Sequence, residues 1–182
     1  MHVDVSDGVF ASVKILNDPQ ALYDFTTPVN IELHLMIDKP EKHLENWLKT
    51  RAKRFLVHIE STRNFSAIAE KLHSENREIG CALHPNTPAD AYAMYASLTP
   101  YVLVLGVVPG PSGQHMQPGI IEKISTLRAA YPNVTIEVDG GVSLALGTAK
   151  KAVEAGADAL CSGYDIFSSK DIAYTIEQFR NL

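Results

Sequence analysis

The chain has 182 residues, enough for one domain with a sizeable core, and we expect residues 1–182 to form a single domain. Its 16 Lys and Arg against 21 Asp and Glu give a net charge of −5, so the sequence lacks the basic excess expected of a protein that binds nucleic acid or an anionic membrane. No apolar run is long enough to span a bilayer, and the residues after Met1 are unlike the basic start of a signal peptide. These features predict a cytoplasmic protein in which Cys81 and Cys161 are reduced.

Short apolar runs alternate along the chain with stretches whose apolar residues recur at helical spacing. The runs, interpreted as β-strands, are residues 2–5, 31–37, 54–60, 78–83, 101–108, 134–140 and 158–163. The helical spacing is carried by Leu44/Trp47/Leu48, Phe65/Ile68/Leu72, Ile120/Ile124/Leu127 and Ile172/Ile176/Phe179. Helix starts are expected at Thr87-Pro88, Pro118 and Ser143, and a helix end at Gly156. This alternation is typical of a parallel sheet covered by helices.

Two parallel architectures fit this pattern, a doubly wound sheet and a TIM barrel. A doubly wound sheet binds its ligand at one switch point, whereas a TIM barrel carries its chemistry at the C-terminal ends of many strands. Polar and glycine-containing segments follow almost every run here, including "SDG", "VDGG" and "SGY", and this distribution favours the barrel. The seven predicted strands are one short of eight, so the expected fold is a TIM (β/α)8-type barrel that lacks its first β-α unit.

The edge of such an incomplete barrel exposes unpaired backbone groups beside the first and last strands. We expect a partner chain, as in a homo-oligomer, or a rearranged segment to cover this edge, unless the gene begins further upstream. An in-frame upstream stretch that encodes an apolar strand and a helix would identify the last case.

Four residues at strand ends have the chemistry of a metal site. His2 and Asp4 share one face of the first strand because side chains alternate along a strand. His34 lies in the second apolar run and Asp139 ends the sixth, so a closed barrel brings all four together. Two imidazoles and two carboxylates suit Zn²⁺, Fe²⁺, Mn²⁺ or Co²⁺. Taken one at a time, a histidine on an apolar strand is more often a hydrogen-bonded core residue, and Asp before Gly-Gly is commonly a turn.

Glycine-rich segments after the late strands have a second chemistry, the binding of phosphate. "DGG" (139–141) is expected to lead straight into a helix capped by Ser143, and "SGY" (162–164) into the last helix. Backbone N–H groups at such helix starts bind anions. The alternative is that these glycines only form tight turns. "PGPSGQ" (109–114) is either a mobile lid that excludes water or an ordinary loop.

Taken together and in this order, these motifs resemble the ribulose-phosphate 3-epimerase family, whose members are TIM-barrel enzymes of pentose-phosphate metabolism. "HVDVSDG" is similar to the family's H-V-D-V-M-D-G, "LHLM" to its H-L-M strand and "HIE" to its H-V-E. "VLVLGVVPGPSGQ" resembles V-L-x-M-x-V-N-P-G-F-x-G-Q, "VDGGV" resembles V-D-G-G-I, and "AGADALCSGYDIF" resembles A-G-A-D-x-x-V-A-G-S-x-I-F. The resemblance covers nearly the whole chain, and several ordered motifs are far more specific than any one of them.

The resemblance implies a role for each matched residue. One divalent metal ion would be held by His2, Asp4, His34 and Asp139. The reaction would invert C3 of a phosphorylated ketose, exchanging D-ribulose 5-phosphate and D-xylulose 5-phosphate through a cis-enediolate, with Asp4 and Asp139 as the two proton-transfer groups. The expected substrate- and phosphate-binding residues are Met36, Gly110, Gly113, Gly140, Gly141, Gly163 and Tyr164.

The sequence departs from the family on the side that faces substrate. Ser6 and Leu105 replace two methionines that cap the enediolate in the family, and Val108 replaces an Asn. These changes leave open an epimerase for a hexulose phosphate, and also a weakly active or non-catalytic barrel paralogue. His58 is interpreted as structural or as a neighbour of a ligand, and His84 as a solvated loop residue. Decarboxylase or aldolase relatives with D-x-K-x-x-D do not fit, because Asp4 is followed by Val5 and Ser6, and Ser6 stands where that motif has its Lys.

Overall fold

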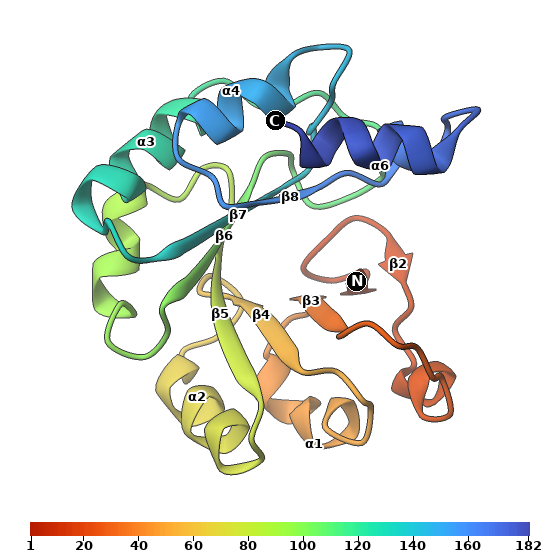
Figure 1. Cartoon of the computed structure of the whole chain (residues 1–182). Helices are drawn as coiled ribbons and strands as arrows, with labels where there is room; N and C mark the ends of the chain where they lie inside the picture. Colours follow the sequence, from red (N-terminus) through yellow and green to blue (C-terminus); the bar gives the residue numbers. More distant parts are fainter.

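The computed structural model describes all residues from 1 to 182 and contains one curled sheet with helices on its outer face (Figure 1). The seven parallel strands are β1 (His2–Asp7), β3 (Glu32–Met36), β4 (Arg54–His58), β5 (Glu78–Leu83), β6 (Tyr101–Leu105), β7 (Thr135–Asp139) and β8 (Ala159–Cys161). Each falls on one of the predicted apolar runs, and parallel neighbours in the sheet follow each other in the chain. The predicted TIM-type barrel of seven parallel strands is confirmed.

The barrel is open between its first and last parallel strands. β8 pairs with β7 alone, and β1 pairs with β3 on one side. On its other side β1 meets the two-residue strand β2 (Lys14–Ile15), which was not predicted and runs antiparallel to it. Because β2 covers only the Ser6–Asp7 end, the rest of that edge of β1 has no strand beside it.

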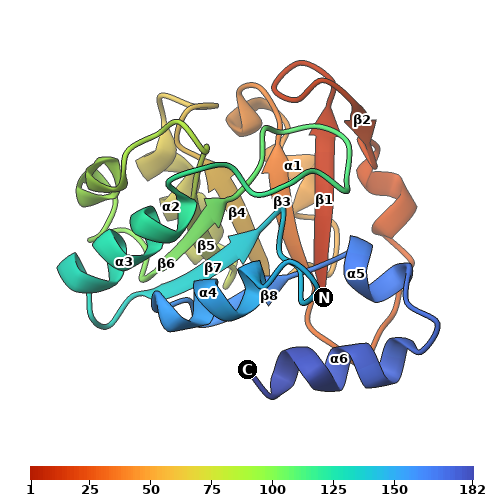
Figure 2. The same ribbon diagram turned by 90° about the horizontal axis from the view of Figure 1, so that it is seen from above.

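Helices pack on the outside of the curled sheet (Figure 2). The α-helices are α1 (Leu44–Trp47), α2 (Phe65–Ser74), α3 (Ile120–Ala130), α4 (Thr148–Glu154), α5 (Tyr164–Phe167) and α6 (Ile172–Arg180). Three short 3-10 helices, η1 (Pro19–Leu22), η2 (Pro40–Lys42) and η3 (Ala89–Met94), complete the connections. The predicted apolar positions of the α1 to α3 stretches are buried, apart from the half-buried Leu48, in a core of 31 buried residues between sheet and helices.

Three helix predictions need correction. "SGY" (162–164) leads into the short helix α5 and not into the last helix, because residues 168–171 separate α5 from α6. The helix expected to start at Ser143 begins at Thr148, because Gly147 takes a left-handed φ of +69° and residues 143–147 form turns before it. The stretch with Ile172, Ile176 and Phe179 does form α6, yet none of its residues is buried. Its apolar face lies along the open side of the barrel, where a complete β-α unit would supply a packing surface.

The barrel interior is divided by polarity, and this division positions the site. Leu56, Ala82 and Leu103 from β4, β5 and β6 form a small apolar cluster inside the barrel. The inward residues of β1, β3 and β7 are instead largely histidines and carboxylates, which therefore face one another across the open side.

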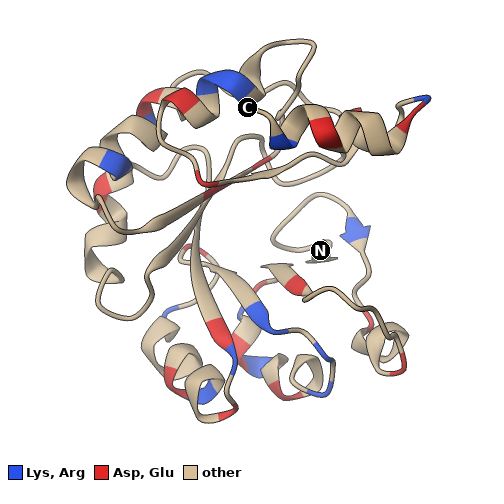
Figure 3. Cartoon of the chain, viewed as in Figure 1, with Lys and Arg blue, Asp and Glu red and all other residues tan.

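Charges and hydropathy carry little further information. Acidic and basic side chains alternate over the outer helices without a one-signed face (Figure 3). No helix is both long and apolar enough to cross a bilayer.

Candidate active site

Strand pairing brings the four predicted metal-ligating residues together. Asp4 and His34 are direct partners in the β1–β3 register, and His2 lies on the same inward face of β1 as Asp4. Asp139 approaches them from the end of β7 across the curled sheet. One ligand atom from each of the four lies within 4.8 Å of the others.

The distances between these atoms suit a single ion. His34 Nδ1 lies 2.9 Å from Asp4 Oδ1 and 3.5 Å from Asp139 Oδ2. His2 Nε2 lies 3.4 Å from Asp4 Oδ1 and 3.9 Å from Asp139 Oδ2, and this buried nitrogen has no hydrogen-bond partner. Tetrahedral bonds of ~2.1 Å place ligand atoms ~3.4 Å apart, so the nitrogens and oxygens already stand at ligand spacing.

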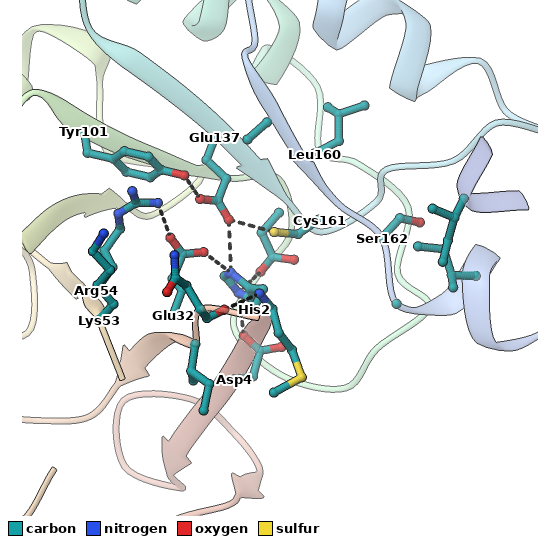
Figure 4. A pocket seen from close by; sticks show the side chains of 18 of the residues that line it. His2, Asp4, Glu32, Lys53, Arg54, Tyr101, Glu137, Leu160, Cys161 and Ser162 are labelled. Atoms are coloured by element: carbon teal, nitrogen blue, oxygen red, sulfur yellow. Dashed lines mark hydrogen bonds and ion pairs between the residues drawn. The ribbon is translucent and has the colours of Figure 1, made fainter. Parts of the chain in front are cut away.

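The other ring nitrogen of His2 faces a second pair of carboxylates (Figure 4). His2 Nδ1 lies 2.9 Å from Glu32 Oε1 and 3.0 Å from Glu137 Oε1. Arg54 donates to Glu32 at 2.8 Å, and the Tyr101 hydroxyl donates to Glu137. Burial alone lowers the pKa of His2, but the surrounding Cys161, Asp4 and Glu137 outweigh it and raise that pKa well above its usual value.

The other ring nitrogen of His34 continues into the protein. His34 Nε2 lies 2.8 Å from His58 Nε2, and His58 Nδ1 lies 3.1 Å from Glu60 Oε2. Both imidazoles are fully buried. Burial lowers the pKa of His58 to about 4 despite the nearby Glu60 carboxylate, so this ring is neutral near pH 7. His58 therefore contacts the predicted ligand His34 without belonging to the cluster of four. This agrees with the interpretation of His58 as a neighbour of a ligand.

A cavity of about 360 Å³ lies at the C-terminal ends of the strands and gathers the predicted site residues that are not histidines. Its lining includes Met36, Asp4, Asp139, Gly110, Gly113, Gly140, Gly141, Gly163 and Tyr164. His2 and His34 do not line this cavity, and they reach its edge only through their contacts with the two aspartates. The position at the strand ends is the one that a TIM barrel uses for chemistry.

The glycines of this cavity differ in whether their positions could hold a larger residue. Gly141 has a φ of +70°, and a Cβ there would lie 2.3 Å from the backbone nitrogen of Met116. Gly163 has an ordinary φ of −81°, and a Cβ there would meet nothing within 4 Å. Neither backbone N–H donates a hydrogen bond within the chain, and the same holds for Gly140. Backbone N–H groups without partners at a cavity wall can receive an anion.

Comparison with known proteins identifies the family of the chain. Residues 1–167 match the model of the ribulose-phosphate 3 epimerase family. The chain belongs to the ribulose-phosphate 3-epimerase family. It is 31% identical to the ribulose-phosphate 3-epimerase of Schizosaccharomyces pombe, a match that covers 100% of this chain and 80% of that protein. It is 32% identical to the cytoplasmic isoform of Oryza sativa, over 99% of this chain and 80% of that protein. It is 36% identical to the chloroplastic ribulose-5-phosphate-3-epimerase of Arabidopsis thaliana, over 97% of this chain and 65% of that protein.

Solved structures support the barrel at lower identity. The orotidine 5'-monophosphate decarboxylase of Sulfolobus solfataricus matches with a TM-score of 0.62 at 15% identity, over 84% of this chain and 72% of that one. The YdjI aldolase of Escherichia coli matches with a TM-score of 0.52 at 12% identity, over 98% of this chain and 84% of that one. These likenesses show the TIM-type fold alone. Family membership makes the protein an enzyme of the carbohydrate epimerase class.

The departures from the family pattern have different structural meanings. Ser6 is fully buried and does not line the cavity, because its hydroxyl donates to the Val13 carbonyl at 2.6 Å and holds the β1–β2 loop. Leu105 does line the cavity, whereas Val108 is 48% exposed and lies outside its lining. Of the three departures, only Leu105 changes the wall of the cavity.

Sequence reasoning missed the partners that hold the histidines. Glu32 shares a face with His34 and Glu137 shares one with Asp139, but that both carboxylates meet His2 was not predicted. Glu60, Arg54 and Tyr101 were not singled out at all. The available signal was the period-two alternation along each strand, which places all of these except Glu60 on inward faces.

The open side of the barrel gives the site a second approach. A cavity of about 890 Å³ extends from His2 and Tyr101 to the apolar face of α6 at Ile172 and Ile176. It shares five residues with the smaller cavity, namely Asp4, Asp139, Cys161, Ser162 and Gly163. The candidate carboxylates are therefore reachable both from the strand ends and through the gap between β8 and β1.

Proposed function

We propose that this enzyme is a metal-dependent epimerase that inverts C3 of D-ribulose 5-phosphate to give D-xylulose 5-phosphate, and the reverse. The observation that carries the proposal is the placement of two carboxylates, Asp4 and Asp139, against two imidazoles at one wall of a cavity. Membership of the ribulose-phosphate 3-epimerase family supports a phosphorylated pentulose as the substrate.

The ligand set fits one divalent ion, with Zn²⁺, Fe²⁺, Mn²⁺ and Co²⁺ as candidates. His2 and His34 would bind it through Nε2 and Nδ1, and Asp4 and Asp139 through carboxylate oxygens. The buried Nε2 of His2, which has no other partner, is the strongest sign that these residues are arranged for a cation. Such an ion, when bound, polarises the substrate oxygens and makes the adjacent C–H bond more acidic.

Asp4 and Asp139 are the proposed acid and base. A carboxylate removes the C3 proton to give an enediolate, and the second carboxyl group returns a proton on the opposite face. Both side chains reach the cavity, since Asp4 is 39% and Asp139 18% exposed, whereas His34 is fully buried. Burial raises the pKa of Asp4, but the neighbouring side chains of His2 and His34 outweigh it and hold that pKa low, so Asp4 is ionised and able to accept a proton.

The phosphate of the substrate is proposed to bind the glycine-rich wall of the cavity. Gly140, Gly141, Gly163 and Tyr164 would offer backbone N–H groups, and Gly110 and Gly113 would close the cavity from the 109–114 loop. Gly113 lies against the ring of Tyr164, since a Cβ on Gly113 would be 3.3 Å from its Cδ2. The 109–114 loop and Tyr164 are therefore neighbours at the cavity wall, as this arrangement requires. Met36 would contact the apolar edge of the sugar.

Location and assembly are also proposals. The cytoplasmic isoform of Oryza sativa is a relative, and we propose the cytoplasm as the compartment here. We further propose that a homo-oligomer covers the gap between β8 and β1, which otherwise admits water to the carboxylates. Light scattering on the purified chain tests this proposal, and a monomer at micromolar concentration would contradict it.

The deciding experiment follows deuterium exchange at C3 of D-ribulose 5-phosphate in D₂O by NMR, after metal analysis of the purified protein. We expect exchange by the wild type with bound metal, and rates lower by about 10²–10⁴-fold in Asp4→Asn and Asp139→Asn. The exposed Asp18→Asn serves as the matched control. Exchange on a hexulose phosphate alone would instead identify a hexulose-phosphate epimerase, favoured by Leu105 in the cavity wall. Bound metal without exchange on any ketose phosphate would identify a non-catalytic paralogue.

A further inference from the structure

His34 is the innermost residue of the candidate site, and its two ring nitrogens have different neighbours. Nδ1 faces Asp4 at 2.9 Å and Asp139 at 3.5 Å, and Nε2 faces His58 Nε2 at 2.8 Å. A ring nitrogen can bind a metal ion only when it carries no proton. The proton of a neutral His34 must therefore be on Nε2 if Nδ1 is to act as a ligand.

Which nitrogen of His34 carries the proton depends on the direction of the hydrogen bond to His58. Two nitrogens 2.8 Å apart share one hydrogen, so one ring donates and the other accepts. If His58 accepts through Nε2, a neutral His58 ring must carry its own proton on Nδ1. His58 Nδ1 lies 3.1 Å from Glu60 Oε2, and an ionised carboxylate accepts hydrogen bonds but cannot donate them.

For His58 to donate from Nδ1, Glu60 must be ionised and its Oε2 must face that nitrogen, and the contacts of Glu60 favour both. Its Oε1 accepts from the backbone N–H of His84 at 2.9 Å and from the Thr87 hydroxyl, which leaves Oε2 directed at His58. Burial raises the pKa of Glu60, but the contact with His58 and the hydrogen bonds from these two donors outweigh it and lower that pKa to about 2, which favours the ionised carboxylate. The ring of Phe10 packs against His58 with ring centroids 4.7 Å apart and keeps the imidazole in place.

Resting on the proposed metal site, we propose that Glu60 and His58 are positioning residues that set the tautomer of His34. The Glu60 carboxylate fixes the proton of His58 on Nδ1, His58 Nε2 accepts the Nε2–H of His34, and Nδ1 of His34 is left for the metal ion. The carboxylate of Glu60, near the surface, thereby determines which ring nitrogen carries the proton in two buried imidazoles, and so which nitrogen of His34 is free to bind the metal ion. Outer partners of this kind fix ring orientation and typically change metal affinity 10–100-fold when they are removed.

The substitution Glu60→Gln tests the donor and acceptor roles in these hydrogen bonds. The Gln amide can donate to Nδ1 of His58, so that His58 Nε2 would donate to His34 instead of accepting from it. Glu60→Asp keeps a carboxylate and should restore the direction. Glu41→Gln is the matched control, since Glu41 also accepts from a threonine hydroxyl, that of Thr62 at 2.8 Å, and contacts no histidine. His58→Phe is a second variant that removes the acceptor altogether.

Two measurements are made on each variant. The first is the tautomer of His58 in metal-free protein by ¹⁵N NMR, for which we expect Nδ1–H in the wild type, Glu60→Asp and Glu41→Gln, and Nε2–H in Glu60→Gln. The second is Co²⁺ affinity by titration of the visible absorption band, for which we expect a 10–100-fold loss in Glu60→Gln and His58→Phe and no change in Glu41→Gln.

The two measurements separate the failure of this proposal from the failure of the proposed function. An Nδ1–H tautomer of His58 in Glu60→Gln, or wild-type Co²⁺ affinity in that variant, would overturn the positioning role while leaving the metal site intact. A wild-type protein that binds neither Co²⁺ nor Zn²⁺ would overturn the metal site. The NMR result would still decide which ring nitrogen of His58 carries the proton. If Glu60→Gln does not fold, His58→Phe decides through its Co²⁺ affinity.

Discussion

Nδ1 of His2 lies 3.0 Å from Oε1 of Glu137, a carboxylate that is only 2% exposed. Burial raises the pKa of Glu137, but the hydrogen bond from His2 outweighs it and lowers that pKa to about 2, so the carboxylate is charged at neutral pH. When Nε2 binds a metal ion, the charged acceptor at Nδ1 keeps the one remaining proton of His2 on that nitrogen. The two histidines of the proposed metal site thus contact separate carboxylates on the side away from the cluster, His2 directly and His34 through His58.

The first prediction concerns this contact. Glu137→Gln removes the charge but keeps an oxygen for the Tyr101 hydroxyl, so the fold should survive while divalent metal affinity falls 10–100-fold. Isothermal titration with Zn²⁺ measures the change. Glu154→Gln, on the exposed face of α4, is the matched control and should leave the affinity unchanged. Equal affinity in Glu137→Gln and the wild type would mean that Glu32 alone orients His2.

The second prediction concerns Ser6, where the family pattern has a methionine. Because Ser6 is fully buried beneath the β1–β2 loop, Ser6→Met should destabilise the protein by about 1–3 kcal/mol through overpacking rather than restore an apolar cap. Ser6→Ala loses the hydrogen bond to the Val13 carbonyl and the longer one from the Gly8 N–H at 3.4 Å, and should cost about 1 kcal/mol. Urea unfolding of both variants gives the comparison. A Ser6→Met protein as stable as the wild type would show that the loop can move aside.

The third prediction contrasts two glycines of the cavity. Gly163→Ala adds a Cβ to open space at an ordinary φ, so stability should change by less than ~0.5 kcal/mol. If Gly163 lies against the phosphate, KM for the sugar phosphate should rise while the melting temperature stays constant. Gly141→Ala places a Cβ 2.3 Å from the Met116 nitrogen at a φ of +70° and should lower the melting temperature as well. An unchanged KM in Gly163→Ala would remove this residue from the phosphate site.

The strands and the proximity of His2, Asp4, His34 and Asp139 could be predicted from sequence because both follow from local periodicity. Alternation along β1 puts His2 and Asp4 on one face, and the ordered strands of a barrel bring His34 and Asp139 to the same place. Neither step requires a side-chain conformation. The seven parallel strands were predicted for the same reason, since each apolar run is long enough to form one strand of the sheet.

What could not be predicted depends on contacts that periodicity does not contain. The strand β2 has two residues and forms only because β1 has a free edge beside it. The contact between His34 and His58 depends on ring rotation in two neighbouring strands, and Ser6 turned out to hold a loop rather than to face the cavity. The apolar face of α6 is correct as a pattern, but its burial depends on a packing partner that the open barrel does not supply.

The last prediction concerns acid stability and Asp7, which ties the end of β1 to its neighbours. Burial raises the pKa of Asp7, but backbone N–H groups of Val9, Phe10 and Asp38 donate to it and lower that pKa below its usual value. The unfolded chain therefore takes up this proton at a higher pH than the folded one. The stability from Asp7 is complete above about pH 4 and is lost as the pH falls through the lower folded pKa. Asp7→Asn should be less stable than the wild type at pH 7 by about 1–2 kcal/mol, and the difference should shrink toward pH 3. Urea midpoints at pH 7, 5, 4 and 3 measure this, and a constant difference would show that the Asp7 charge does not stabilise the loop.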